Sequence, residues 1–264
     1  MDKVNMFNIN FDNITFADLM EFILDAKKNK KQTYILTCNV DHVVQTTKDR
    51  EFAEIYSNAD LVVADGVPIM WASKLIKRPL KQKISGSDIL PVLGKEFEKN
   101  EVSLFFLGAA EGIAFKAAEN LRKKYQNIKI VGCYSPTYGF ENNEEENEKI
   151  LDKIKSAKPD VLMVGVGAPK QEKWIYKYYK QYDVPVSIGV GATFDFISGN
   201  VVRAPAILQT LGLEWFWRFL QEPKRLFHRY FIEDSKFIVL IIKELLKNKK
   251  AINFQKNEEE KRNV

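Results

Sequence analysis

Short runs of β-branched and aromatic residues alternate with amphipathic stretches along most of this 264-residue chain. The runs predict strands at residues 34–38, 61–64, 102–107, 128–133, 161–166 and 186–190. The amphipathic stretches predict helices at residues 15–29, 41–57, 68–76, 88–99, 111–125, 144–157 and 170–182. Such alternation is typical of a parallel sheet covered by helices. We therefore predict an α/β fold with a Rossmann-like, mostly parallel sheet and flanking helices.

The alternation stops after Gly199, and helix-like segments follow around residues 213–220, 223–230 and 234–247. Pro223 suits the first turn of the second segment. In the third, Ile238, Ile241, Ile242 and Leu245 recur at helical spacing and are expected to share one face. We predict an α/β domain over residues 1–195, a helical appendage over 196–250 and a disordered tail over 251–264.

The appendage concentrates positive charge and aromatic rings. Residues 203–250 contain ten Lys and Arg against five Asp and Glu, and this excess equals the formal net charge of the chain, +5. Such a segment is expected to bind something anionic with an apolar neighbour, namely a lipid surface or a lipid-linked phosphate. The longest apolar run in it, residues 237–242, is far shorter than the roughly 18 residues that span a bilayer. We therefore expect it to lie on an anionic membrane surface.

The two cysteines, Cys38 and Cys133, have no metal-ligand spacing. We expect both to be buried small hydrophobic residues in a reducing cytoplasm. The first residues are mixed and polar, without a basic start followed by an apolar run, so export is not expected. These features predict a cytoplasmic protein.

Polar residues follow two of the predicted strands, where the carboxyl ends of a parallel sheet line a ligand crevice. Thr37 and Asn39 precede Asp41 and His42, although Asn39 or Asp41 could equally cap a helix. Asp65 precedes Gly66 after the second strand, which suits either a tight turn or a base that accepts a proton from a bound hydroxyl.

Small residues follow three further strands. The segment 108–112, GAAEG, would let backbone N–H groups approach a phosphate, but it does not match the GxGxxG dinucleotide signature. Segments 165–172, GVGAPKQE, and 189–195, GVGATFD, could cradle a nucleotide and its sugar, or could allow helices to pack closely on the sheet.

Several signatures of metal and nucleotide chemistry are missing from the sequence. It contains no GxxxxGK[ST], HExxH, GxSxG or DxD pattern. We therefore expect no metal and no cofactor. If a diphosphate leaves during a reaction, cationic side chains must stabilise it.

The strand-end segments described above resemble the WecG/TagA/CpsF glycosyltransferase family, closest to its TagA branch. The same holds for the segments that follow them, GNVVRAP at residues 199–205 and GLEWFWRFLQEPKRLFHRY at 212–230. The resemblance covers residues 8–230. It implies a metal-independent, inverting transfer from a UDP-sugar to polyprenyl-diphosphate-linked GlcNAc at the inner face of the membrane. In that branch UDP-N-acetylmannosamine (UDP-ManNAc) and undecaprenyl-diphosphate-GlcNAc are the substrates, for an early step of wall teichoic acid linkage-unit synthesis. UDP-ManNAc uronic acid and UDP-glucose are alternative donors for other surface polysaccharides.

The resemblance also implies roles for individual residues. Asp65 matches the proposed catalytic base. The expected substrate-binding residues are Thr37, Asn39, Lys83, Gly108, Gly167, Gln171, Gly191, Asp195, Arg203, Arg218, Arg225 and Arg229. Two positions depart from the family pattern, because Lys83 and His228 stand where arginines are expected. Lysine lacks the bidentate fork of arginine, and Arg229 or a protonated His228 would have to replace the second contact.

Other interpretations remain open at this point. Aromatic rings among basic residues also suit a nucleic-acid binder, which we disfavour because the rest of the chain is neutral and a sheet-end pocket would go unused. A catalytically inactive membrane scaffold is a third possibility. Within the appendage, Trp215, Phe216, Phe219 and Leu220 could instead pack on the sheet domain or on another subunit, so a homo-oligomer is possible.

Overall fold

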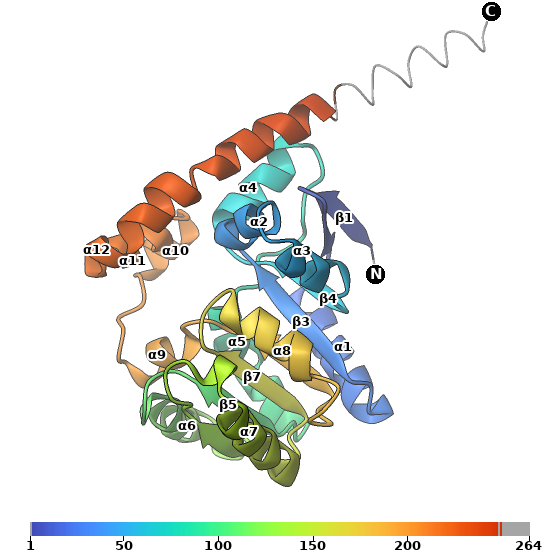
Figure 1. Cartoon of the computed structure of the whole chain (residues 1–264), viewed down its shortest axis with the longest axis vertical. Coiled ribbons are helices and arrows are strands. Elements are labelled where there is room, and N and C mark those ends of the chain that lie inside the picture. The colour runs from blue at the N-terminus through green and yellow to red at the C-terminus, as the bar shows by residue number, and fades with distance from the viewer. Residues whose placement is uncertain (1, 248, 250–264) are drawn as a thin grey trace, which may run out of the picture.

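The computed structural model describes residues 2–247 and 249 (Figure 1). At its centre six parallel strands lie in the order β4-β3-β8-β7-β5-β6. Their bounds are Thr33–Cys38 (β3), Leu61–Ala64 (β4), Leu104–Gly108 (β5), Ile130–Tyr134 (β6), Val161–Gly165 (β7) and Val186–Gly189 (β8). The predicted parallel α/β fold is confirmed, and each predicted strand end lies within two residues of the observed one.

Helices cover both faces of the sheet, and each face has its own apolar core. Successive residues of β7 point to opposite sides, with Leu162 and Val164 in one core and Val161 and Met163 in the other. This explains why the strands are apolar without alternation. The first core is covered by α2 (Val40–Thr46), α3 (Arg50–Ser57), α4 (Val67–Leu75), α7 (Glu144–Ala157) and α8 (Lys170–Tyr178), and the second by α1 (Phe16–Asn29), α5 (Gly86–Lys99), α6 (Ile113–Lys124) and α9 (Thr193–Ser198).

Two parts of the N-terminal region differ from the sequence prediction. The helix expected over residues 41–57 is two helices, because the Asp49 carboxylate accepts a hydrogen bond from Phe52 N (3.1 Å) and starts α3. An antiparallel hairpin of β1 (Lys3–Met6) and β2 (Ile9–Asp12) was not predicted. Phe7 and Asn8 make its turn with positive φ angles of 56° and 63°, the geometry of a tight hairpin.

The boundary predicted after residue 195 falls inside α9. This helix packs on α6, and Phe194 is fully buried with its ring centroid 4.8 Å from that of Phe106. The α/β unit therefore includes α9 through Ser198. We call residues 200–247 the arm; it contains α10 (Ala206–Thr210), α11 (Glu214–Gln221), α12 (Pro223–Phe227), the π-helix η2 (His228–Glu233) and a helix over residues 236–247. The predicted tail, 251–264, lies outside the described residues.

The arm runs back along the side of the sheet domain that carries α2 and α4 (Figure 1). At Gly212, φ is +70° and an added Cβ would lie 2.9 Å from the Cβ of Val67 in α4, so glycine permits this close approach. Further on, Phe237 is buried, with its ring centroid 5.1 Å from that of Phe7 in the hairpin. Residues 238, 241, 242 and 245 lie at helical spacing within this helix, as predicted, but they do not form one buried stripe. Residues 241 and 245 pack on the core, whereas 238 and 242 are exposed.

Candidate active site

A pocket of about 1060 Å³ lies at the carboxyl ends of the central strands, with the arm forming part of its wall. It gathers side chains from sequence segments far apart, as expected for the strand ends of a parallel sheet. Eleven of the thirteen residues predicted as catalytic or substrate-binding line it: Thr37, Asn39, Asp65, Lys83, Gly167, Gln171, Gly191, Asp195, Arg218, Arg225 and Arg229.

Asp65 occupies the turn between β4 and α4. Its backbone N–H donates to the carbonyl of Cys38 (2.8 Å), and the hydroxyl of Ser85 donates to Asp65 Oδ1 (2.6 Å). Burial raises the pKa of this carboxyl above the usual aspartate value, while the Ser85 hydrogen bond and the charge of Lys83 oppose that rise. The result is a carboxylate suited to accept a proton.

Beside Asp65, Lys83 is held in a charged network. Its ammonium lies 2.7 Å from Asp88 Oδ2 and 3.3 Å from the Ser85 hydroxyl. Burial opposes ionisation of Asp88, but the hydrogen bonds and charges of Lys83 and Arg203 outweigh it and lower the pKa of Asp88. Lys83 therefore bridges Asp88 and the Ser85 hydroxyl that contacts Asp65.

Three predicted substrate-binding residues, Thr37, Asn39 and Gln171, line another part of the pocket. The Thr37 hydroxyl donates to the carbonyl of Gly189 (3.0 Å). Asn39 caps α2 by accepting from His42 N (3.1 Å), so the capping interpretation is confirmed, and Asn39 lines the pocket as well. Gln171 Oε1 accepts from Gly191 N (3.1 Å). These hydrogen bonds within the protein hold the three side chains in place.

Next to these residues lies a buried polar pair, Glu172 and His42, of which His42 lines the pocket. Burial raises the pKa of Glu172 to about 7, although a hydrogen bond from Gln171 (2.7 Å) favours the ionised form. Burial also lowers the pKa of His42 to about 4, and its Nδ1 lies 2.6 Å from the Tyr56 hydroxyl. His42 is therefore neutral at pH 7, and its contact with Glu172 (3.9 Å) is not an ion pair.

The predicted cationic residues have different surroundings. Arg218 lies over the ring of Phe196, 5.7 Å from its centroid, and has no carboxylate partner among the described residues. Arg225 is exposed and pairs with Glu222 (2.5 Å), whereas Arg229 pairs with Asp41 (3.2 Å). Of the two alternatives at the end of α12, Arg229 lines the pocket, and the exposed His228 is not among the lining residues.

Two predicted substrate-binding residues do not line the pocket. Arg203 is engaged by Asp88 (2.6 Å) and Glu214 (3.0 Å). The carbonyl of Gly108 accepts from the Ser135 hydroxyl (3.2 Å), and its backbone lies against that of Gly165. Arg203 and Gly108 therefore contact residues next to the pocket without lining it themselves.

Several lining residues were not singled out from the sequence. Ser85 lies two residues after Lys83 in the sequence, but only the structure shows its hydrogen bond to Asp65. The loop after β6 contributes Tyr138 and Phe140, and this loop is another strand end of the same sheet. Phe196 and Tyr230 come from α9 and the arm, and only the folded arrangement brings them together.

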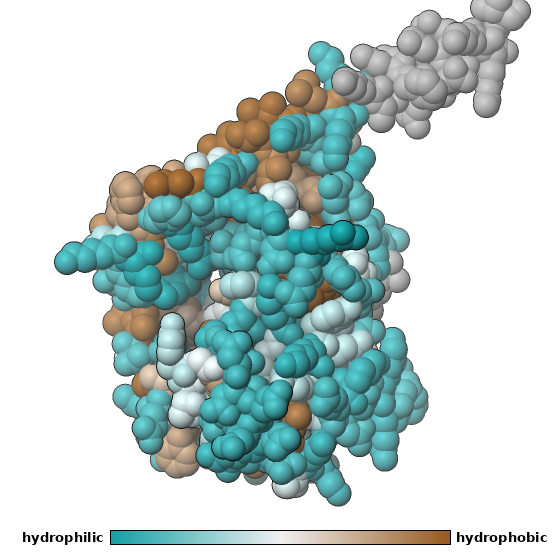
Figure 2. Space-filling model, in the orientation of Figure 1, coloured by the Kyte–Doolittle hydropathy of each residue, from teal (hydrophilic) through white to brown (hydrophobic). Residues whose placement is uncertain are grey.

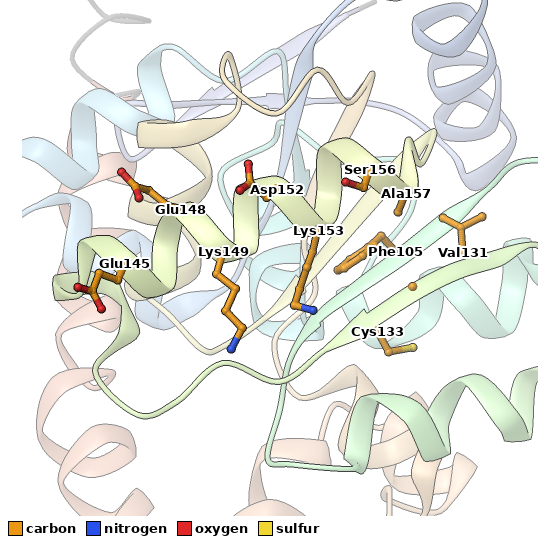
Figure 3. A pocket seen from close by; sticks show the side chains of 11 residues that line it. Phe105, Val131, Cys133, Glu145, Glu148, Lys149, Asp152, Lys153, Ser156 and Ala157 are labelled. Atoms are coloured by element: carbon orange, nitrogen blue, oxygen red, sulfur yellow. The ribbon is translucent and has the colours of Figure 1, made fainter.

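A second concavity, of about 760 Å³, lies between β6 and α7 (Figure 3). Lys149 and Lys153 extend from α7 and lie 5.3 and 5.1 Å from the ring centroid of Tyr134. Cys133 lines this concavity and is only partly buried, contrary to prediction, whereas Cys38 is fully buried as predicted. The concavity contains none of the predicted site residues, so we assign the candidate site to the larger pocket.

Within residues 2–247 and 249, no three His, Cys, Asp or Glu side chains are grouped as metal ligands would be. In the same part of the chain, no helix combines the length and apolar character needed to cross a bilayer.

Comparisons with known proteins place the chain in a family. The model of the glycosyl transferase WecG/TagA/CpsF family matches residues 4–251. A protein of Staphylococcus aureus (strain MW2) is 32% identical over 226 residues, which are 85% of this chain and 87% of that protein. One of Bacillus spizizenii is 31% identical over 213 residues, 81% of this chain and 80% of that protein. Both are named N-acetylglucosaminyldiphosphoundecaprenol N-acetyl-beta-D-mannosaminyltransferase. The chain therefore belongs to the WecG/TagA/CpsF family and is a glycosyltransferase.

Proposed function

We propose that this enzyme transfers N-acetylmannosamine from UDP-ManNAc to undecaprenyl-diphosphate-GlcNAc, an early step of wall teichoic acid linkage-unit synthesis. The observation that carries the proposal is the placement of Asp65 and Arg218 in one pocket of about 1060 Å³, the carboxyl on the sheet and the arginine on the arm. A pocket of this size can hold a nucleotide-sugar together with a sugar diphosphate. The names of the two relatives supply the substrates.

The proposed reaction is a single displacement with inversion. Asp65 takes the proton of the acceptor hydroxyl, whose oxygen forms a bond to the anomeric carbon of the donor. The bond from that carbon to UDP breaks, and its electron pair leaves with UDP. Arg218 and Lys83 are the cations that would stabilise the developing diphosphate charge, so the proposed reaction needs no metal.

We further propose that the arm docks on the anionic inner face of the membrane, where the acceptor lipid lies. Apolar side chains on the arm remain exposed, including Ile207 (73%), Leu220 (58%) and Ile238 (62%). Figure 2 shows hydrophobic residues gathered along the C-terminal helix with hydrophilic neighbours. Apolar groups flanked by Lys and Arg suit a lipid interface. The family context favours a membrane over another subunit or a nucleic acid as the occupant of this surface.

A donor panel tests the proposed chemistry. UDP-ManNAc, UDP-ManNAc uronic acid and UDP-glucose are assayed with one synthetic prenyl-diphosphate-GlcNAc acceptor, with and without EDTA. We expect transfer from UDP-ManNAc at the same rate in EDTA, giving the anomer opposite to that of the donor. Preference for either alternative donor would overturn the donor assignment, and loss of activity in EDTA would overturn metal independence.

A second assay tests the occupant of the arm's surface. The full chain is mixed with anionic liposomes and, separately, with single-stranded DNA at moderate salt. We expect binding to the liposomes and none to the DNA. Binding to DNA alone would indicate a nucleic-acid-binding protein and contradict the membrane proposal.

A further inference from the structure

Arg203 and Arg229 share an arrangement that Arg218 lacks. Each places its guanidinium between two carboxylates, one on the sheet domain and one on the arm. The two arrangements lie at different helices of the sheet domain, α5 and α2.

The first arrangement, centred on Arg203, uses three of its nitrogens. Nη2 lies 2.6 Å from Asp88 Oδ1, Nε lies 3.0 Å from Glu214 Oε1 of α11, and Nη1 donates to the carbonyl of Ser87 (3.4 Å). The fixed fork of arginine can satisfy these acceptors at once, whereas lysine cannot. Because Asp88 also holds Lys83, this arrangement connects α11 with the reacting end of the pocket.

The second arrangement is looser. Arg229 Nη2 lies 3.2 Å from Asp41 Oδ2 in the first turn of α2, and Nε lies 3.9 Å from Asp234 Oδ2. Lys48 of the sheet domain pairs with Glu233 beside it. Asp41 follows Asn39 by two residues, so this arrangement holds the arm against the part of the pocket that Asn39 lines.

Arg218 lies on α11, next to the Arg203 arrangement. The guanidinium groups of Arg203 and Arg218 lie 5.9 and 5.7 Å from the centroid of the Phe196 ring. Nε of Arg218 is buried and, like Nε of Arg229, has no hydrogen-bond partner among the described residues, but the Arg218 guanidinium also lacks the carboxylates that flank Arg229. A buried guanidinium nitrogen without a partner is costly unless a ligand supplies an acceptor.

We propose that Arg203 and Arg229 are positioning residues that fasten the arm to two walls of the pocket and thereby hold Arg218 in place. The fastening of the arm is argued only from the ion pairs of Arg203 and Arg229. The identification of a diphosphate as the ligand of Arg218 rests on the proposed function. Both positions were predicted from the sequence as substrate-binding, and the proposal gives them a different task.

The two roles have different kinetic consequences. Loss of a fastening residue lowers the fraction of molecules with the arm seated, so the apparent affinity for acceptor falls by the same factor. Saturating acceptor restores the seated form, and kcat is largely retained. Loss of an arginine that contacts the leaving diphosphate lowers kcat itself, because the contact strengthens in the transition state.

The test compares Arg203→Gln and Arg229→Gln with Arg218→Gln in the full chain. We expect the first two to raise the KM for prenyl-diphosphate-GlcNAc about tenfold with kcat within about twofold, the effect of Arg229→Gln being smaller. We expect Arg218→Gln to lower kcat by about tenfold or more. Amide hydrogen exchange in residues 214–221 of the substrate-free protein should rise in Arg203→Gln and stay unchanged in Arg218→Gln; in Arg229→Gln it should rise in residues 228–233.

Two further variants protect the test against misfolding. Glu214→Gln removes the arm carboxylate that pairs with Arg203, so it should reproduce the KM and exchange changes of Arg203→Gln. Arg203→Lys should show smaller changes in KM and exchange than Arg203→Gln. Unchanged exchange together with a lower kcat in Arg203→Gln would overturn the proposal and make Arg203 a direct ligand. If the wild-type chain transfers no sugar to this acceptor, the proposed function fails, whereas the exchange measurements still decide the fastening.

Discussion

Asp65 is subject to opposing influences that together set the pH range in which it can act. Burial raises its pKa, and the 2.6 Å hydrogen bond from Ser85 and the nearby charge of Lys83 limit the rise. The proposed base must be ionised to accept a proton, so we expect activity to be lost as pH falls through the raised pKa of Asp65.

Replacement of Asp65 by asparagine removes the proposed base and keeps its shape. We expect kcat to fall by about 100-fold or more, because general bases contribute roughly 10²–10⁴-fold. Sugar transfer measures the loss, and circular dichroism checks the fold. The exposed Asp152 of α7 gives the control, since Asp152→Asn should leave kcat unchanged. Near-normal turnover in Asp65→Asn would contradict the assignment.

Removal of the Ser85 hydroxyl takes a stabilising hydrogen bond from the Asp65 carboxylate. The pKa of Asp65 should then rise further, and we expect the acid limb of the kcat/KM profile of Ser85→Ala to move to higher pH. Ser87 is the control, because it lines the same pocket and its side chain makes no hydrogen bond to Asp65. An acid limb that stays in place or moves to lower pH would show that Asp65 does not set it.

At the scale of the elements, the strand ends and the Asn39 cap were predictable, whereas the Asp49 cap and the tertiary contacts were not. The sequence patterns predicted all six strands of the parallel sheet and the strand ends that meet at one pocket, whereas the family resemblance supplied the pocket residues outside the strand ends, namely Lys83, Arg218, Arg225 and Arg229. The sequence did not predict the side of helix 236–247 that meets the sheet domain. That side depends on the position of Phe7 in the hairpin, and both sides of the helix are apolar. Arg203 was misplaced for the same reason, since its carboxylate partner in α5 is distant in sequence.

The burial of Glu172, on α8, predicts a pH-dependent stability. Glu172 has a pKa of about 7 in the folded chain against an ordinary value of 4.5. Its stabilising contribution is therefore fully present below pH 4.5 and is lost as pH rises to about 7. Glu172→Gln keeps the group neutral and should raise the free energy of unfolding at pH 8 by up to about 3 kcal/mol, with little effect near pH 4.5.

Urea unfolding of Glu172→Gln and wild type at the two pH values measures this difference. The exposed Glu148 of α7 is a matched control, because Glu148→Gln should change stability little at either pH. Equal stability of Glu172→Gln and wild type at pH 8 would show that Glu172 is not held protonated in the fold.

At the scale of the whole molecule, the arm contributes both a wall of the pocket and an apolar surface. Phe227 is 54% exposed on the arm, and Phe115, on α6, is 57% exposed. We expect Phe227→Ser to weaken sedimentation with anionic vesicles several-fold, because it removes buried apolar area at the lipid interface. Phe115→Ser should bind like wild type. Equal weakening by both changes would contradict a specific docking face, and loss of a dimer in Phe227→Ser would point to a second copy as its occupant.

Truncation separates the two parts of the chain. We propose that a chain ending at Gly199 retains α9, whose Phe194 fills the core, and folds as the sheet domain. It should lose nearly all transfer activity, because Arg218 and the rest of the arm wall are gone. A chain ending at residue 195 cuts α9 and should be less stable in thermal unfolding. Full activity of the Gly199 truncation would show that the arm is dispensable.

The packing of Phe237 on Phe7 joins the hairpin formed by residues 3–12 to the last described helix. During synthesis, the hairpin emerges from the ribosome before the sheet domain, and its apolar contact Phe237 emerges more than two hundred residues later. The sheet domain can assemble in the meantime, but the arm cannot be seated until residue 237 has left the ribosome. A growing chain therefore has the Asp65 carboxylate early and gains a complete pocket only after residue 237 has emerged.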